Sequence, residues 1–174
     1  GPTAPCLMPT AATRTKRLQR NRRSSSIASS DGTRNLFSNL SEPDSVDAVL
    51  TFRNLHNWLG PDMDRIFSNS FKALKPGGLF GVVEHRAKPG SSMETMKKSG
   101  YVTEQHAIKI ARKHGFELVS KSEINANPKD STDHPKGVWT LPPNFRLKDI
   151  DKDKYEAIGE SDRMTLLFRK PLAA

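Results

Sequence analysis

Apolar residues in this chain form short continuous runs, and between the first two runs they recur at the spacing of one face of a helix. Val46–Phe52 is a nearly continuous apolar run of seven residues with β-branched content, and a Pro43-Asp44 turn precedes it. A run of this kind predicts a strand that is buried on both faces of a sheet. Leu79–Glu84 has the same texture and predicts a second such strand.

The segment between these two runs has the period of a helix. Gly60-Pro61-Asp62 is typical of a helix start, with proline in the first turn and an acid near the positive end of the helix dipole. Lys75-Pro76-Gly77-Gly78 ends the helix, and the apolar stripe inside it consists of Met63, Ile66, Phe67, Phe71 and Leu74. A strand, a helix and a strand with short connections indicate parallel α/β architecture.

The second half of the chain repeats the pattern once. Thr103 is a helix N-cap, Gly115 follows the helix end, and Phe116–Ile124 is the third predicted strand. The long polar stretch 125–160 carries four prolines and no periodic segment. Arg163–Arg169 is the last predicted strand. Because long loops in compact domains are often functional, the polar stretch is a candidate substrate lid.

The charge of the chain is concentrated at its beginning. The 174 residues include 28 Lys and Arg against 19 Asp and Glu, a net charge of +9, which suggests an anionic partner. Residues 1–30, however, hold six basic residues and no acid, which leaves +3 on the rest. We therefore divide the chain into a disordered, Ser- and Arg-rich leader, 1–35, and an α/β domain, 36–174. A leader of this composition also fits a targeting segment.

Several function classes lack support in the sequence. No apolar run approaches the roughly 20 residues that cross a bilayer, so no membrane partner is expected. The single cysteine, Cys6, excludes an intramolecular disulfide framework and a cysteine-based zinc finger. Asp133, His134 and Glu123 lack the spacing of metal ligands, so no metal site is predicted. Phosphate-loop and hydrolase motifs are absent.

Leu74-Lys75-Pro76-Gly77-Gly78-Leu79-Phe80 resembles the segment ahead of the fifth strand in class I S-adenosylmethionine-dependent methyltransferases. Asp47–Phe52 resembles the fourth strand of that family, and Phe116–Ile124 and Arg163–Arg169 resemble the sixth and seventh. Stretches across residues 40–171 are similar to a bacterial group of predicted methyltransferases. The resemblance implies a partial Rossmann-like sheet, made of the fourth to seventh strands with flanking helices, and S-adenosylmethionine as the cofactor.

The resemblance also implies where the site residues lie, because ligands of such folds sit outside the carboxyl ends of the parallel strands. The expected cofactor contacts are Phe52, Arg53 and Asn54, the catalytic residues are His56, Glu84 and His85, and the substrate contacts are Trp58, Asn125, His134 and Trp139. An imidazole there can accept a proton from the methyl acceptor.

Purely structural interpretations of the same residues stay open. Asn54 can cap a turn, His56 can be a hydrogen-bonding loop residue, and Trp58 can pack on the following helix. Glu84-His85-Arg86 can be a surface charge cluster.

The family's glycine-rich cofactor turn, which follows its first strand, has no counterpart before residue 46. The expected function is therefore methyl transfer to an unidentified acceptor, impaired in this chain. Without a preceding strand Val46–Phe52 becomes an apolar edge, which predicts self-association, coverage by the leader or poor solubility. The alternative is a non-catalytic module whose basic leader binds nucleic acid or acidic partners, although the balanced charge of the domain makes nucleic acid the less favoured partner. The expected location is the cytoplasm.

Overall fold

A computed structural model describes residues 40–172, in which four strands form one mixed sheet. The strands are β1 (Val46–Phe52), β2 (Leu74–His85), β3 (Glu117–Ser122) and β4 (Arg163–Arg169), in the spatial order β1-β2-β4-β3. β1 pairs with β2 in parallel, and β4 is antiparallel to both β2 and β3. This confirms the expected α/β class with a Rossmann-like partial sheet. The predicted leader, 1–35, and Cys6 lie outside the described residues.

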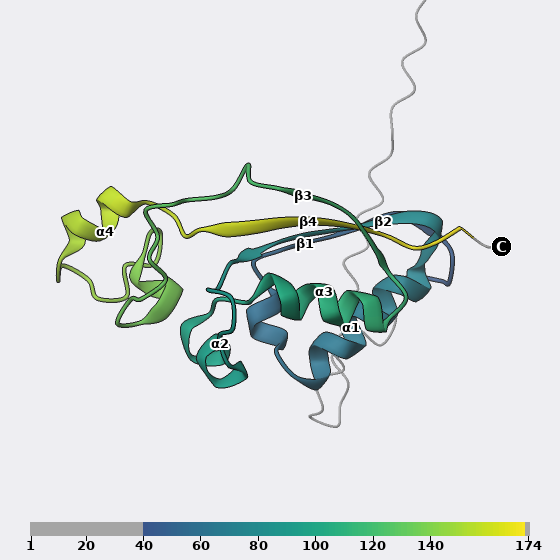
Figure 1. Ribbon diagram of the computed structural model, residues 1–174, viewed down its shortest axis with the longest axis horizontal. Coiled ribbons are helices and arrows are strands. Elements are labelled where there is room, and N and C mark those ends of the chain that lie inside the picture. The colour runs from purple at the N-terminus through teal and green to yellow at the C-terminus, as the bar shows by residue number, and fades with distance from the viewer. Residues whose placement is uncertain (1–39, 173–174) are drawn as a thin grey trace, which may run out of the picture. The chain divides into compact units, whose positions relative to one another are not determined.

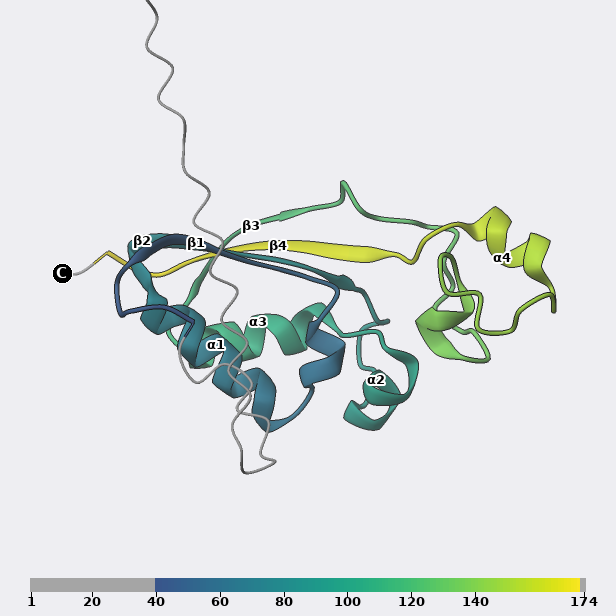
Figure 2. The same cartoon turned by 180° about the vertical axis from the view of Figure 1, so that it is seen from behind.

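Among the helices of the described part, those that precede β3 lie on one side of the sheet, and the last one lies beyond the ends of the strands (Figures 1 and 2). The helices are α1 (Pro61–Ala73), α2 (Met93–Ser99), α3 (Glu104–Lys113) and α4 (Lys152–Ile158). α1 starts as its sequence predicts, with Pro61 in the first turn and two acids there, and Thr103 caps α3 by accepting from the His106 amide. α2 and α4 are not among the predicted helices. Both are only seven residues long, which is too short for a periodic signal.

The main core lies between the sheet and the pair α1 and α3. The rings of Phe67 and Phe80 meet edge to face with centroids 5.1 Å apart, and Phe80 also contacts Phe116 and Phe168. Fully buried aromatic rings contribute most of the apolar area in a core of this size. The stripe residues Met63, Ile66 and Phe67 are buried in this core, as their helical spacing predicts.

β2 begins earlier than its sequence predicts. The strand starts at Leu74 and runs through Lys75-Pro76-Gly77-Gly78, the residues that the sequence predicts to end the helix ahead of a strand at Leu79. Leu74 pairs with Val46, and the register shifts between Val46 and Ala48. Gly77 has a φ of +81°, a conformation that favours glycine, and donates to the Lys170 carbonyl at 2.8 Å. A bulged strand start thus follows the end of α1 directly.

β1 is an edge strand of the described sheet, and only one of its faces is covered. Leu50 and Phe52 are 62% and 56% exposed, so the prediction of burial on both faces is wrong. On that face Leu50 lies over Gly81, where a Cβ atom would come within 2.6 Å of the leucine side chain. The helices cover the opposite face, which leaves Leu50 and Phe52 without a covering layer in residues 40–172.

The long polar stretch folds beyond the carboxyl ends of the parallel strands (Figures 1 and 2). β3 ends at Ser122, two residues before the predicted end, and a 3-10 turn, Gly137–Thr140, and helix α4 follow in the stretch that lacked periodic segments. Within the described residues no helix has the length and apolar content to cross a membrane.

Candidate functional site

The turn after β1 carries a histidine to the end of β2. Arg53 has a φ of +55°, a left-handed conformation that is strained for a residue with a Cβ atom, and its amide donates to the Val83 carbonyl at 2.7 Å. The chain then turns into the short 3-10 helix Leu55–Trp58, anchored by the fully buried Leu55. This geometry places His56 beside Glu84.

Glu84 is a fully buried carboxylate held by three donors. Oε1 accepts from the His85 amide at 2.8 Å and lies 3.0 Å from His56 Nδ1, while Oε2 accepts from the His56 amide at 3.1 Å. An ionised carboxylate accepts only, so His56 carries its proton on Nδ1. The pair therefore has the arrangement in which a carboxylate fixes the tautomer of a histidine.

His85 is buried next to this pair. Its Nδ1 lies 2.5 Å from the Ser161 hydroxyl, and its Nε2 lies 4.0 Å from Glu84 Oε1. Burial first of all, together with the charges of His56, Arg163 and Arg53, lowers the pKa of His85 to about 3. His85 is thus a neutral imidazole at physiological pH.

The polar stretch packs over His56. The Trp139 ring meets the His56 ring edge to face, with centroids 6.0 Å apart, and the Arg146 guanidinium lies 4.7 Å above the Trp139 ring. The backbone of Gly100 packs directly against the Trp139 ring, since a Cβ atom added at this glycine would come within 2.9 Å of the ring. The predicted substrate residue Trp139 therefore borders the histidine cluster.

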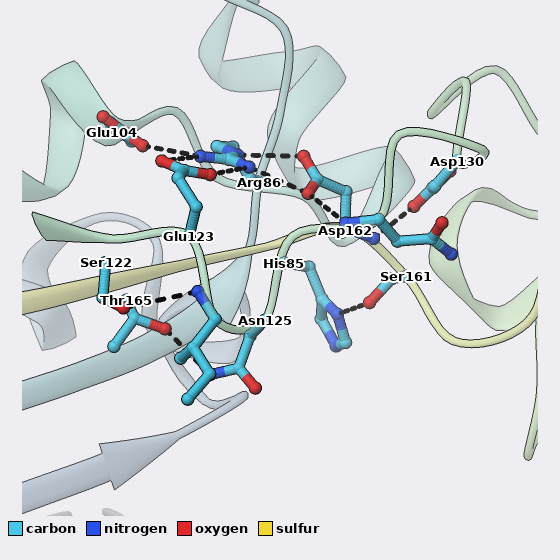
Figure 3. A network of polar contacts seen from close by, with 12 residues as sticks. His85, Arg86, Glu104, Ser122, Glu123, Asn125, Asp130, Ser161, Asp162 and Thr165 are labelled. Atoms are coloured by element: carbon cyan, nitrogen blue, oxygen red, sulfur yellow. Dashed lines mark hydrogen bonds and ion pairs between the residues drawn. The ribbon is translucent and has the colours of Figure 1, made fainter.

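Arg86, the residue after the histidine cluster, ties three segments together (Figure 3). Its guanidinium makes two hydrogen bonds of 2.9 Å to Asp162 and further bonds to Glu104 and Glu123. The hydrogen bonds that Arg86 donates to Asp162 and Glu123 raise the pKa of Arg86 above its usual range. Burial by itself would raise the pKa of Asp162, but the bonds from Arg86 outweigh it and the pKa is lowered. Glu84, His85 and Arg86 are bonded to buried or half-buried groups, so the surface-cluster interpretation is wrong.

The remaining predicted residues lie in three places. Phe52, Arg53 and Asn54 lie at the end of β1, where Asn54 makes no side-chain cap to the turn that follows. Trp58 packs against the main core. Asn125 lines the pocket that contains Arg53, and its amide donates to the Thr165 hydroxyl at 2.8 Å (Figure 3).

His134 lies in a separate cluster. Its Nε2 is 2.7 Å from Asp130 Oδ1, and its ring meets the ring of Tyr155. Asp130 also accepts from the Tyr101 hydroxyl at 2.9 Å and from the amides of Thr132 and Asp162. Desolvation and the charge of Asp130 raise the pKa of Tyr101. The structure does not bring His134 into contact with His56 or Glu84.

Sequence reasoning did not identify Ser161, Tyr101 or Arg163 as site residues. Ser161 bonds His85 from the segment before β4, and the ring of Tyr101 meets that of His85. Ser161 is 76 residues from His85 along the chain, so no spacing signal connects them. Arg163 pairs with His85 across β2 and β4, a position that follows from the register alone.

The comparisons with known proteins concern structure alone, because no family model and no curated protein matches this sequence. A SAM-dependent methyltransferase from Methanosarcina mazei aligns with a TM-score of 0.50 and 13% identity over 78% of this chain and 64% of that one. The [4+2]-cyclase SpnF aligns at 0.49 and 18%, over 78% and 53%. An S-adenosylmethionine-dependent methyltransferase from Mesorhizobium loti aligns at 0.41 and 16%, over 73% and 62%.

The likeness to the Methanosarcina mazei structure shows the class of fold. The chain has the fold of class I S-adenosylmethionine-dependent methyltransferases, with the partial Rossmann-like sheet that the resemblance implied. The chain spans a little more than half to about two thirds of the lengths of these three structures. Fold alone does not determine a reaction, because the reaction depends on the residues and geometry of the site.

Proposed function

We propose that this chain provides the acceptor side of an S-adenosylmethionine-dependent methyltransferase. The observation that supports this most strongly is the buried Glu84–His56 pair at the carboxyl ends of two parallel strands, beside the neutral His85. Such strand ends are where ligands bind in open α/β sheets. A buried carboxylate that is hydrogen-bonded to an imidazole is also the usual arrangement of a general base.

His56 would act as the base. Because Nδ1 donates to Glu84, the lone pair of His56 is on Nε2 and can accept a proton from the acceptor's nucleophilic atom. Glu84 stabilises the imidazolium that forms. S-adenosylmethionine, when bound, supplies the electrophilic methyl group, and the transfer then depends mainly on positioning. The acceptor remains unassigned.

The residues present fit this cofactor only in part. Phe52, Arg53 and Asn54 border the site from the end of β1, and the Arg53 side chain is exposed. Residues 40–172 contain no glycine-rich turn after a strand that precedes β1, which is the element that lets a backbone approach the nucleoside closely. We propose that a segment outside these residues, or another chain, completes the cofactor site.

The edge of β1 is where we propose such a partner pairs. A pocket of about 390 Å³ runs along this edge, and two of its lining atoms, the Thr51 and Ser70 hydroxyls, are buried without a hydrogen-bond partner in the described residues. An apolar edge strand with unpaired backbone groups is a template for another strand. For the isolated chain we propose self-association through this edge, and Leu50→Lys should convert the oligomer to monomer in sedimentation velocity. A monomeric wild-type chain would contradict this.

Calorimetry with S-adenosylhomocysteine tests the methyltransferase proposal. We expect the full chain to bind it with a dissociation constant of about 1 mM, corresponding to about 4 kcal/mol, because only part of the cofactor site is present. Asn54→Ala should weaken binding at least several-fold, whereas Asn144→Ala, an exposed asparagine elsewhere, should leave it unchanged. No heat at 5 mM ligand, or an equal effect of both substitutions, would contradict the proposal.

A further inference from the structure

The three groups at the strand ends also have the composition of a metal site. Within residues 40–172, His56, Glu84 and His85 form a group whose potential ligand atoms all lie within 4.8 Å of one another. Two imidazoles and one carboxylate are a ligand set that zinc and related divalent ions accept, with a further coordination position left open. The sequence alone predicts no metal here, because the two strand ends meet only in the fold.

We propose that His56 Nδ1, Glu84 Oε1 and His85 Nε2 form a binding site for a divalent transition-metal ion of the zinc class. Ligand atoms bonded at about 2.1 Å in a tetrahedron lie about 3.4 Å from each other. His56 Nδ1 is 3.0 Å and His85 Nε2 is 4.0 Å from Glu84 Oε1. Shifts of about half an ångström in the two rings therefore bring both pairs to the tetrahedral distance.

His85 is already oriented for this role. The buried Ser161 hydroxyl engages Nδ1, so the ring is fixed and Nε2 faces Glu84. When Nδ1 carries the proton, the Nε2 lone pair faces a carboxylate oxygen with no donor between them. A cation placed between these two acceptors would bind both. A hydrogen bond on the second ring nitrogen is the arrangement that orients most metal-binding histidines.

Glu84 is oriented as well and lacks a strong counterion. The amides of His56 and His85 fix both carboxylate oxygens, so the side chain loses little freedom on binding. The ion-pair partners of Glu84 among the described residues are the two histidines, and no lysine or arginine bridges to it. A fully buried carboxylate of this kind gains most from a cation, because burial without a compensating charge is costly.

Two neighbouring charges limit the affinity. Arg53 and Arg163 lie close enough to His85 to lower its pKa electrostatically, and the same field disfavours a bound cation. We therefore expect a dissociation constant of about 10 μM rather than the far tighter binding of structural zinc sites.

Metal binding and the proposed proton transfer use the same atom. His56 Nδ1 cannot donate to Glu84 and bind a metal at once, so an ion at this site displaces the Glu84–His56 hydrogen bond. The metal site goes beyond the proposed function and does not depend on it, because it needs neither the nucleoside nor an acceptor.

Titration of the full chain with Zn²⁺ and Co²⁺ after treatment with chelator tests the site. We expect one equivalent to bind, with absorption bands of cobalt in a low-coordinate site, and a loss of affinity of at least 30-fold in Glu84→Gln and in His85→Gln. The matched control is His106→Gln, a half-buried histidine on α3 outside the cluster, and Cys6→Ser controls for the thiol. Both controls should bind as the wild type does.

The opposite results would overturn the proposal. Absence of binding at 1 mM metal would do so, as would equal affinity in Glu84→Gln, provided that circular dichroism shows this variant folded. If Glu84→Gln does not fold, His56→Asn gives the same test without removing the buried carboxylate. Failure of S-adenosylhomocysteine binding with intact metal binding would count against the proposed function alone.

Discussion

Two buried carboxylate–histidine pairs occur in residues 40–172, and they differ in what surrounds them. Glu84 and Asp130 both have fully buried side chains, with histidine nitrogens at 3.0 Å and 2.7 Å. Asp130 accepts from four residues, among them the Tyr101 hydroxyl and the Asp162 amide, which join three segments of the chain. Glu84 is held only by the two histidines that flank the strand ends.

We propose that this difference separates a structural pair from a candidate catalytic one. The donors to Asp130 come from the Tyr101 region, its own turn and the segment before β4, so its carboxylate fixes the polar stretch in place. Glu84 instead orients an imidazole beside a neutral histidine at the edge of the sheet where ligands bind. A buried acid–histidine pair is therefore a candidate site only where its hydrogen-bond partners leave a histidine nitrogen free to accept a proton or bind a ligand.

Removal of Asp130 should have the largest effect on stability. Asp130→Ala leaves the Tyr101 hydroxyl, the His134 ring and two amides without their acceptor, so we expect a loss of about 3–5 kcal/mol in the free energy of unfolding. Urea denaturation measures this. Ser131→Ala, at the exposed neighbouring position, should stay within about 0.5 kcal/mol. Equal stabilities of the two variants would remove the contrast with Glu84.

Acidification should destabilise the site through His85. The pKa of His85 in the folded state, about 3, lies below the unfolded value of 6.5, so the unfolded state binds more protons between these values. Stability is therefore complete above pH 6.5 and falls as the pH drops, by about 2 kcal/mol between pH 6.5 and 5. Unfolding curves in chelator should show this slope. Burial also lowers the pKa of His106, so the comparison of His85→Gln with wild type is made in a His106→Gln background. An unchanged slope in His85→Gln would contradict the prediction.

Glu84→Gln should cost less stability than the loss of Asp130. Glutamine keeps one carbonyl oxygen as an acceptor, so we expect a loss of about 1 kcal/mol by urea denaturation. Proton transfer should suffer far more, because the amide cannot stabilise the imidazolium of His56. A loss as large as that of Asp130→Ala would place Glu84 among the structural carboxylates.

Arg53→Gly should have the smallest effect on stability, and in the opposite direction. Glycine relieves the left-handed backbone at φ +55°, so we expect a gain of about 0.5 kcal/mol. Binding of S-adenosylhomocysteine should weaken at the same time. Lys148→Gly, at φ +57°, is the matched control and should gain stability with unchanged binding. Unchanged binding in Arg53→Gly would show that its strain serves no ligand.

The sequence predicted the parts of the fold that depend on local pattern. β1 and β4 match their apolar runs residue for residue, and the stripe Met63, Ile66 and Phe67 packs as its spacing predicts. The early start of β2 was missed because a bulge lets Pro76 and Gly77 lie within a strand. The seven-residue α4 carries too few periodic positions to be recognised.

In the candidate site, too, local pattern predicted some residues and missed those that tertiary structure brings in. Strand ends identified His56, Glu84 and His85, because parallel strands bring their carboxyl ends to one edge. His134 was assigned to the substrate because its loop is polar, but its partner, Asp130, lies four residues away in the same stretch. Ser161 and Tyr101 reach the cluster through the pairing of β4 and the bridge between Arg86 and Val102, which no local pattern encodes.

An NMR titration of the full chain with S-adenosylhomocysteine tests the central claim most directly, because it reports on both carboxylate–histidine pairs at once. We predict that amide resonances of Arg53–His56 and Glu84–Arg86 shift on titration, while those around Asp130 and His134 stay in place. Shifts confined to the Asp130 cluster, or none at either pair at millimolar ligand, would contradict the account.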